Sequence, residues 1–331
     1  MADSDFKVLL NRLVQTPEYF SADDLKSALN HLFTPMSSLP FKLAHFSPPC
    51  TSIASKDGLN LWQAAASVLR DRSLKAFVEE PEGDFIVDVV GTGGDGYNLF
   101  NVSTTAAIVA AGAGARVIKH GSRASTSSSG SADLLQALGC VFTAPAPGTT
   151  TPIPRIPFTF ILAPHYHPAL AFIAPYRKSL PFRTMFNVLG PLINPARPQG
   201  MVLGVAEREI GHTFAQRALV VCGYEKLDEL IDGVITEKTL TPELFGVEPH
   251  PLSTVVGGSP EDNAKTFTSL LTSGADIPDA LKPVLDFVLI NTSALLVVAG
   301  LAKDYVHGTE LARDSITSGK AWAALQTFKQ A

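Results

Sequence analysis

The chain has 331 residues, 46% of them hydrophobic and 17% charged, which is enough apolar material for a sizeable core and excludes intrinsic disorder as its main state. A formal net charge of −5 excludes the basic field of a nucleic-acid binder without sequence preference. Three widely spaced cysteines without a CxxC pair exclude a disulfide scaffold or a cysteine zinc site and favour a reducing, cytoplasmic location. The acidic start has no apolar segment, so we expect neither a signal peptide nor a transit peptide. We also find no apolar run of the length that spans a membrane.

The first 80 residues are predicted to form a layer of helices. Apolar residues over 6–14 and 61–69 follow the spacing of one helical face. Ser21 followed by Asp24 predicts a capping box at the start of another helix. Residues 34–56 are rich in proline and serine, which indicates a loop. We expect no catalytic residue in this part of the chain.

From Asp84 onward, strand patterns alternate with helical patterns. Strands are expected at 85–90, 116–119, 158–162, 201–205 and 287–290, and helices at 101–113, 131–139 and from 309. Residues 167–200 are expected to be helical with proline breaks. This alternation predicts an α/β fold with a mainly parallel central sheet flanked by helices, plus a small N-terminal all-helical domain.

The strongest chemical signal is Gly91-Thr-Gly-Gly-Asp-Gly96, between a predicted strand and a predicted helix. Four glycines in six residues let the backbone approach a ligand closely and present several N–H groups to an anion. The sequence fits neither a Walker loop nor a Rossmann fingerprint. Asp95 places a carboxylate inside this anion-binding loop, which indicates that a metal ion lies between the carboxylate and the bound anion. The alternative is that the glycines only form an ordinary turn, because glycine is common in turns and loops of every function.

Three further segments suited to anions follow. Asn101, Ser103 and Thr104 lie at a predicted helix N-terminus, where hydroxyls and free N–H groups attract anions or simply cap the helix. Lys119–Arg123 ends the next strand, at the edge where parallel sheets bind ligands. Residues 125–131 form a small-residue loop suited to a phosphorylated ligand or to a flexible linker. Three such turns at successive strand ends indicate one shared anion site.

The order GTGGDG, NVST, KHGSR, SGSAD, PHYHPAL and FNVLGPLINP resembles that of the anthranilate phosphoribosyltransferases, from about Asp84 to the C-terminus. The resemblance implies a homodimer formed through a small helical domain, 1–83 with about 170–200, and a large α/β domain, 84–169 and 201–331. It implies transfer of the 5-phosphoribosyl group from phosphoribosyl pyrophosphate (PRPP) to the amine of anthranilate in tryptophan biosynthesis, with release of pyrophosphate. The implied cofactor is Mg²⁺, and neither nucleic acid nor a membrane is an expected partner.

The same resemblance implies the site residues. For PRPP they are Gly91, Thr92, Gly93, Gly94, Asp95, Asn101, Ser103, Thr104, Lys119 and Ser131. For anthranilate they are His120, Gly121, Ser122 and Arg177, and for magnesium Ser103, Asp228 and Glu229. No general acid or base is assigned, because an aromatic amine is already a neutral nucleophile.

The chain departs from the family pattern at two places. Ser122 stands where the family usually has asparagine. The small-residue stretch that usually follows the acidic pair is absent at Leu230-Ile231, where the pattern changes without turn residues, as it also does near 216/217. We expect loop residues of the family to be missing at both positions.

Several alternatives stay open. A pyrimidine nucleoside phosphorylase of the same fold shares the NVST and FNVLGPLINP segments, whereas the KHGSR turn and the acidic pair favour the anthranilate enzyme. A non-catalytic relative that binds anionic ligands is the other alternative. Without the resemblance, Arg177 is an ordinary surface arginine and Asp228-Glu229 a solvated turn. His165 and His167 lack a third ligand for zinc and are expected to be packing residues.

Overall fold

A computed structural model describes residues 2–34, 58–78, 84–93, 96–124, 127–146, 151–171, 173, 185–206, 219–222, 226–231 and 234–331. The helices are α1 (Ala2–Gln15), α2 (Ala22–Leu32), α4 (Gly58–Asp71), α5 (Val102–Gly112), α6 (Ser131–Ala137), α7 (Ala163–Tyr166), α9 (Met185–Val188), α11 (Pro260–Thr272), α12 (Lys282–Val298), α13 (Tyr305–Thr317) and α14 (Lys320–Gln330). Short 3-10 helices include η1 (Pro17–Tyr19), η3 (Gly190–Ile193) and η6 (Asp279–Leu281).

A seven-stranded sheet forms the centre of the molecule, in the order β5-β3-β2-β6-β7-β8-β9. The strands are β2 (Ile86–Gly91), β3 (Arg116–Gly121), β5 (Phe158–Leu162), β6 (Gly200–Val205), β7 (Leu219–Cys222), β8 (Lys226–Ile231) and β9 (Val234–Lys238). The first five are parallel to their neighbours, and β8 and β9 add an antiparallel hairpin at one edge. β1 (Ala76–Val78) and β4 (Thr151–Ile153) form a separate parallel pair. The predicted α/β class with a mainly parallel sheet is confirmed.

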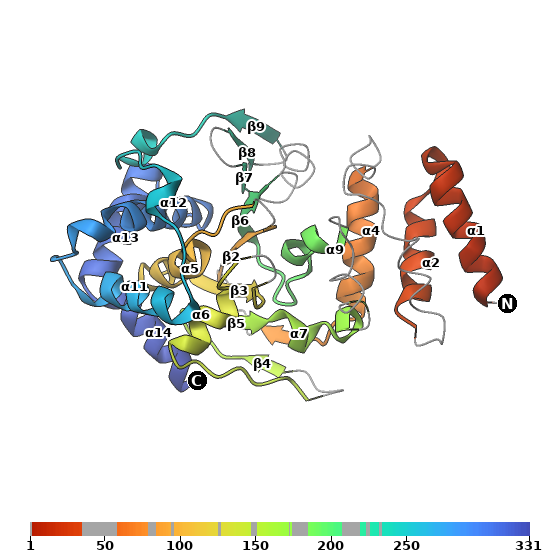
Figure 1. Ribbon diagram of the computed structural model, residues 1–331, viewed down its shortest axis with the longest axis horizontal. Helices are drawn as coiled ribbons and strands as arrows, with labels where there is room; N and C mark the ends of the chain where they lie inside the picture. The colour runs from red at the N-terminus through yellow and green to blue at the C-terminus, as the bar shows by residue number, and fades with distance from the viewer. Residues whose placement is uncertain are drawn as a thin grey trace.

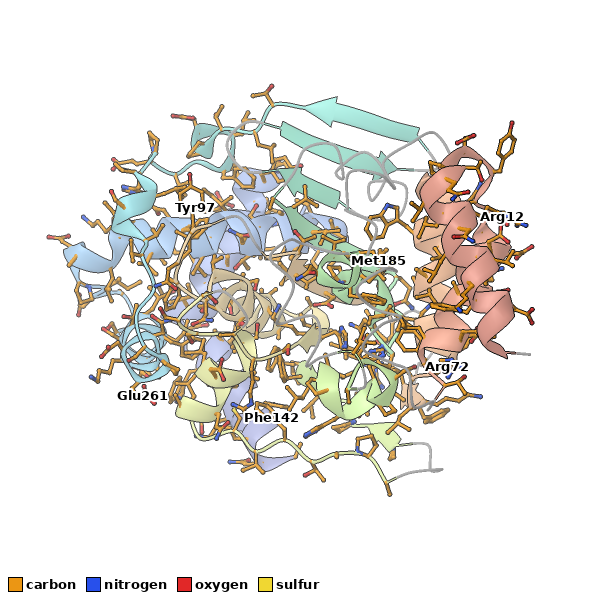
Figure 2. The ribbon with its side chains drawn as sticks, turned by 45° about the vertical axis from the view of Figure 1, so that its right-hand side comes forward. Arg12, Arg72, Tyr97, Phe142, Met185 and Glu261 are labelled. Atoms are coloured by element: carbon orange, nitrogen blue, oxygen red, sulfur yellow. The ribbon has the colours of Figure 1, made fainter. Side chains whose placement is uncertain are left out.

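Helices cover the two faces of this sheet differently (Figure 1). On one face α5 packs against α12, α13 and α14, and the apolar side chains of these helices join those of β2 and β3 in one core cluster. On the other face α9 and η3 lie between the sheet and the bundle α1, α2 and α4. A second core cluster links this bundle to Ala169 and Ile173, to residues 185–193 and to Leu203 and Val205 of β6, with Met185 fully buried in it (Figure 2). Each face of the sheet is therefore covered by its own layer of helices with its own apolar core cluster.

Local sequence explains where the bundle helices begin. Ser21 caps α2, because its hydroxyl accepts a hydrogen bond from the Asp24 N–H at 3.1 Å and the Asp24 carboxylate accepts one from the Ser21 N–H at 3.0 Å. This confirms the predicted capping box. The face of α2 that carries Leu25, Leu29 and Leu32 is buried against the rest of the bundle.

Three expectations need correction. Residues 287–290, predicted to be a strand, lie inside α12, because a short apolar run fits a buried helix as well as a strand. Residues 76–78 form β1, within a stretch expected to be helical. The C-terminal helix divides into α13 and α14 at Gly319, whose φ is +78°. The predicted loop at 34–56 and the transition at 216/217 lie almost wholly outside the described residues, while Leu230 and Ile231 end β8.

The expectation that no apolar run has the length of a membrane span is also wrong. An 18-residue window within the stretch Asp279–Val298 has a mean hydropathy of 1.7, which by length and composition is enough to cross a membrane, and this is the one such helix among the described residues. Half of this stretch is buried in the protein, where α12 packs against α5, α13 and β6. A helix that is apolar on all sides is typical of a core position between several elements.

Candidate active site

The predicted turns meet at the carboxyl end of the parallel sheet. Gly91 of β2 pairs with Gly204 of β6, and Gly121 of β3 pairs with Leu162 of β5, so the strands end at one edge. The Thr92 N–H donates to the Gly204 carbonyl at 2.9 Å, which directs the glycine loop away from the sheet. Gly93 and Gly96 have φ values of +65° and +78°, a conformation that side-chain-bearing residues rarely adopt. The loop therefore needs its glycines for its backbone path.

Lys119 lies on the α5 face of this edge and is only 1% exposed. Its ammonium donates to the Val89 carbonyl and to the Ser103 hydroxyl, the latter at 3.4 Å. Burial lowers the pKa of Lys119, and the negative charge of Asp88 opposes this effect. The ammonium is thus held rigidly beside the first turn of α5, at the base of the two glycine-containing loops.

The loop that follows β3 is closed by the Asp133 carboxylate. One carboxylate oxygen accepts hydrogen bonds from the Ala124 N–H at 2.8 Å and the Gly130 N–H at 3.0 Å, and the other pairs with Arg123 at 3.0 Å. Burial alone would favour the protonated acid, but these donors outweigh it and lower the pKa of Asp133. A Cβ at Gly130 would lie 2.3 Å from the Ala124 nitrogen, so only glycine fits. The two stems of the loop are therefore clamped together.

A different polar group occupies the face of the sheet toward the helical bundle. Asp88 is fully buried in β2, and its Oδ2 accepts hydrogen bonds from Asn194 Nδ2 at 2.9 Å and the His120 N–H at 3.3 Å. Asn194 Nδ2 also donates to the Ile118 carbonyl at 3.0 Å, and Asn194 Oδ1 accepts from the Ala196 N–H. Burial raises the pKa of Asp88, which the charge of Lys119 and the amide of Asn194 oppose. Asn194 thereby ties the segment that follows η3 to β2 and β3.

His120 and His167 form a buried pair on this same face. Their ring centroids are 5.1 Å apart in an edge-to-face arrangement. Burial lowers the pKa of His120 to about 3 and that of His167 to about 4, so both rings are neutral near pH 7. His120 Nδ1 lies 3.2 Å from the Gly190 carbonyl, which can only accept. This contact assigns the proton to Nδ1 and leaves Nε2 of His120 as a lone-pair acceptor without a partner among the described residues.

The structure brings most of the described candidates together. Thr92, Gly93, Asn101, Ser103, Thr104, Lys119, His120, Gly121, Ser122 and Ser131 all belong to the ends of β2 and β3 or to the first turns of α5 and α6. Ser122 is exposed and its carbonyl accepts from the Ala132 N–H, whereas Thr104 is fully buried. Gly94, Asp95 and Arg177 lie outside the described residues.

The acidic pair is placed differently from the expectation. In place of the turn considered from the sequence, Asp228 and Glu229 lie in the middle of β8, in the antiparallel hairpin. Asp228 pairs with Val220, which is in register with Leu203 and, through it, with Val90. The pair is thus three strands away from β2. The sequence concealed this because the residues of an edge hairpin follow no βαβ alternation.

Four polar residues of this region were not singled out from the sequence. Asp88 could have been recognised from the sequence, because it lies in the middle of an apolar strand and a buried carboxylate needs specific partners. Asn98, Asn194 and Asn263 carry no comparable signal. Asparagine is common in loops, and the partners of these residues come from segments distant in sequence.

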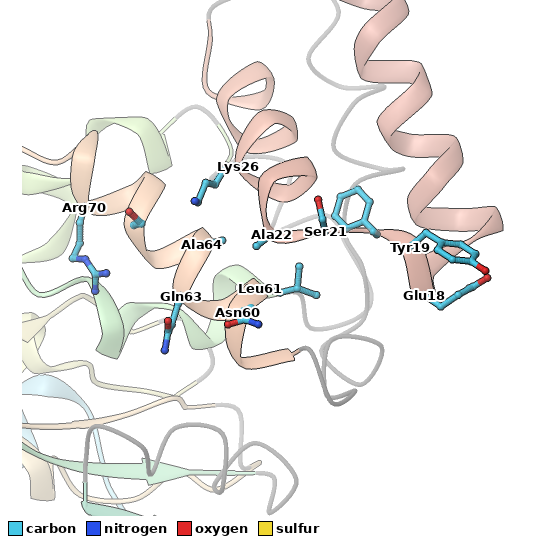
Figure 3. Close-up of a pocket in the computed structure, with 12 residues that line it drawn as sticks. Glu18, Tyr19, Ser21, Ala22, Lys26, Asn60, Leu61, Gln63, Ala64 and Arg70 are labelled. Carbon is cyan, nitrogen blue, oxygen red and sulfur yellow. The ribbon is translucent and has the colours of Figure 1, made fainter. Parts of the chain in front are cut away.

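A groove of about 630 Å³ lies elsewhere, between the start of α2 and α4 (Figure 3). Its lining includes Tyr19, Lys26, Leu61, Gln63 and Arg70. None of the predicted site residues lines it, so it is a surface feature of the helical bundle and distinct from the strand-end site.

Comparison with known proteins gives consistent results. A family model described as glycosyl transferase family, a/b domain, matches residues 83–322. The anthranilate phosphoribosyltransferase of Schizosaccharomyces pombe is 40% identical over 326 residues, covering 92% of this chain and 91% of that protein. The Saccharomyces cerevisiae anthranilate phosphoribosyltransferase in complex with PRPP and Mg has a TM-score of 0.84 at 29% identity, over 99% of this chain and 97% of the other.

The Saccharomyces cerevisiae enzyme in complex with 4-fluoroanthranilate has a TM-score of 0.81 at 27% identity, covering 100% of this chain and 98% of the other. The relatives therefore match this chain along almost its whole length, across the helical bundle as well as the sheet and its strand-end turns. This chain belongs to the anthranilate phosphoribosyltransferase family.

Proposed function

We propose that this protein transfers the 5-phosphoribosyl group from PRPP to the amine of anthranilate, with release of pyrophosphate, as a step of tryptophan biosynthesis. The observation that carries the proposal is the division of the strand-end site into two environments. One face holds a buried ammonium beside a helix N-terminus and glycine-containing loops, and the other holds two neutral histidines. A polyphosphate donor requires the first environment, and a planar aromatic acceptor fits the second.

We assign the donor to the α5 face. The loop Gly91–Asp95, with Asn101, Ser103, Thr104, Lys119 and Ser131, holds the phosphates. N–H groups at a helix N-terminus and a fixed ammonium stabilise anionic oxygens. Because pyrophosphate departs as positive charge develops on the ribose ring, donors fixed at the departing oxygens lower the barrier. The rigid hold on Lys119 keeps this charge in place before the reaction begins.

We assign the acceptor to the face toward the bundle, with His120, Gly121, Ser122 and Arg177. His120 Nε2 is buried and has no hydrogen-bond partner among the described residues, and we propose that it accepts a hydrogen bond from the substrate amine, which orients the nitrogen lone pair toward the anomeric carbon. A guanidinium meets a planar carboxylate through two parallel hydrogen bonds, and this is the role proposed for Arg177. No residue is assigned as a general base, because the amine attacks while neutral and burial lowers the pKa of His120 to about 3, which makes its imidazole a weak base.

Magnesium fits the chemistry of the proposed donor set, because hydroxyl and carboxylate oxygens are the ligands it prefers. β8 is separated from β2 by β6 and β7, and at ~4.8 Å between neighbouring strands this amounts to roughly 14 Å. We therefore propose that Ser103 and the pair Asp228-Glu229 serve different magnesium ions. Bound magnesium supplies positive charge that neutralises the pyrophosphate. Changing Asp228→Asn together with Glu229→Gln should raise the free Mg²⁺ needed for half-maximal turnover, and an unchanged requirement would remove the pair from the metal site.

We also propose a cytoplasmic homodimer with a helical domain of 1–83 and about 170–200 and an α/β domain of 84–169 and 201–331. The separate core clusters support this division. Val8 and Val14 expose apolar surface on α1, and Tyr19 of η1 is exposed and lines the groove of Figure 3, which supports dimerisation through the bundle. The free thiol of Cys140 fits a reducing compartment. Light scattering on the purified protein should give the mass of two chains.

The proposed reaction is tested directly by the fluorescence of anthranilate. The fluorescence should fall when PRPP and Mg²⁺ are added together and stay constant when either is omitted. Constant fluorescence in the presence of measurable PRPP binding would indicate a non-catalytic relative. Phosphate-dependent release of a base from a pyrimidine nucleoside would indicate the phosphorylase.

A further inference from the structure

A segment far along the chain, residues 255–263, supports the two loops at the proposed donor site. Leu99 and Val256 form an isolated β-bridge, the Phe100 N–H donates to the Val255 carbonyl at 2.9 Å, and the Gly257 N–H donates to the Asn98 carbonyl at 2.8 Å. A Cβ at Gly257 would lie 2.5 Å from the Leu99 carbonyl oxygen, so the two backbones are in close contact. We call residues 255–263 the brace.

Asn263 connects the brace to the first turn of α5. It is 3% exposed, its Oδ1 accepts from the Gly258 N–H at 2.8 Å, and its Nδ2 donates to Asn101 Oδ1 at 2.8 Å. The Gly258 N–H can only donate, so the amide of Asn263 has one permitted orientation. Asn101 Oδ1 must then face Asn263, and Asn101 Nδ2 must face the opposite way.

That orientation of Asn101 is the one that holds the loop after β3. Asn101 Nδ2 donates to the Ser129 carbonyl at 2.9 Å, and Asn101 Oδ1 accepts from the Ser129 hydroxyl at 3.0 Å. Rotating the Asn101 amide by half a turn would place its Oδ1 against the Ser129 carbonyl and break that bond, while the Ser129 hydroxyl would have to turn from donor to acceptor. The orientation of Asn263 is thus transmitted through Asn101 to Ser129, and it links three segments that are distant in sequence.

We propose that Asn263 is a positioning residue for the phosphoribosyl donor. It fixes the amide of Asn101 and thereby pins residues 127–130 against the N-terminus of α5. It does not touch the ligand. That the ligand is PRPP rests on the proposed function. That Asn263 holds residues 127–130 in place rests on the hydrogen bonds alone. Asn98 adds a second, independent connection, because its Nδ2 donates to the Gly257 carbonyl at 2.7 Å and its Oδ1 accepts from the Ser128 N–H at 2.8 Å.

The test is Asn263→Asp, which keeps the shape and the acceptor for Gly258 but replaces the donor to Asn101 by an oxygen. Hydrogen exchange of the unliganded protein should quicken about tenfold or more at residues 127–130 and stay unchanged in β2 and β3. PRPP dissociation constants measured by calorimetry should rise about ten- to a hundredfold. The KM for anthranilate should stay within about twofold of the parent value. Saturating PRPP should restore slow exchange in the loop.

The matched control is Asn291→Asp, since Asn291 Nδ2 donates only within its own helix, to the Phe287 carbonyl at 2.9 Å. This control should change neither loop exchange nor PRPP binding. If Asn263→Asp does not fold, Asn263→Ala carries the test, because it also removes the donor to Asn101 and adds no charge. Unchanged exchange at 127–130 in the folded variant would overturn the proposal, as would an equal rise in both substrate constants. Failure of the parent protein to bind PRPP would contradict the proposed function. Hydrogen exchange is measured without substrate, so it would still show whether the brace holds residues 127–130.

Discussion

Lys119 and His120 are adjacent in the chain and lie on opposite faces of the sheet, in opposite environments. Lys119 places an ammonium beside the hydroxyl of Ser103 on the α5 face. His120 packs against the ring of His167 on the face toward the bundle, where burial lowers its pKa to about 3 and keeps it neutral. Because successive side chains of a strand point to opposite faces, one short turn serves a charged region and an uncharged region. In the proposed function, the donor and the acceptor therefore use opposite faces of one strand end.

Replacing Lys119 by methionine should give the largest difference between the effects on the two substrates. PRPP affinity should fall by about ten- to over a hundredfold, because a charge-assisted hydrogen bond is worth about 1.5–3 kcal/mol. The KM for anthranilate should change less than about twofold. The change removes a charge that is costly to bury, as the lowered pKa of Lys119 indicates, together with the hydrogen bonds to Val89 and Ser103, so the melting temperature should change little. Calorimetry and thermal unfolding check this, with Lys329→Met as a control, since Lys329 also donates to a carbonyl, that of Leu138, on the surface. Unchanged PRPP affinity would remove Lys119 from the donor site.

Asn194→Ala should damage the opposite face. The change removes the Asn194 donor from two buried acceptors, the Asp88 carboxylate, which keeps the His120 N–H, and the Ile118 carbonyl. The free energy of unfolding should fall by about 2–4 kcal/mol. In the folded fraction, the KM for anthranilate should rise more than that for PRPP, because His120 is bonded to the same carboxylate. Denaturant unfolding and steady-state kinetics measure both effects. An equal rise in the two constants would contradict the division into two faces.

The neutral histidines predict a pH dependence of stability. The pKa of His167 is lowered from 6.5 to about 4 in the folded protein, so the unfolded chain binds a proton more readily. This contribution to stability is fully present above about pH 6.5 and is lost as the pH falls toward 4, by about 1.4 kcal/mol per pH unit. His167→Leu should flatten the decline in unfolding free energy between pH 6.5 and 5. His165→Leu is the control from the same segment and should keep the parent slope.

Asp133→Asn should have the smallest effect, and only on the charged face. An amide can still accept from the Ala124 and Gly130 N–H groups, but it loses the ion pair with Arg123, whose side chain is 55% exposed. Exposed pairs contribute about 0–1 kcal/mol, so the KM for PRPP should rise only a few-fold. Steady-state kinetics at saturating anthranilate would show this. A loss above a hundredfold would mean that Asp133 contacts the ligand itself.

Short segments of the sequence were enough to predict much of this architecture. The alternation of apolar strands and helices from Asp84 predicted β2, β3, β5 and β6, and Ser21 with Asp24 predicted the start of α2. The glycines at 93 and 96 marked a loop whose positive φ angles require them. Local steric and hydrogen-bonding rules act over a few residues, so a single segment contains all the information that they need.

Other features depended on which segments meet. Residues 287–290 are helical because α12 is enclosed by several elements, and an apolar run does not reveal how many neighbours will cover it. The acidic pair lies in β8 because a hairpin adds to the sheet edge beside β7. The roles of Asp88, Asn194 and Asn263 follow from partners about 106, 76 and 162 positions away in the chain. A buried hydrogen bond is worth most where water is excluded, and only the folded packing of distant segments excludes it.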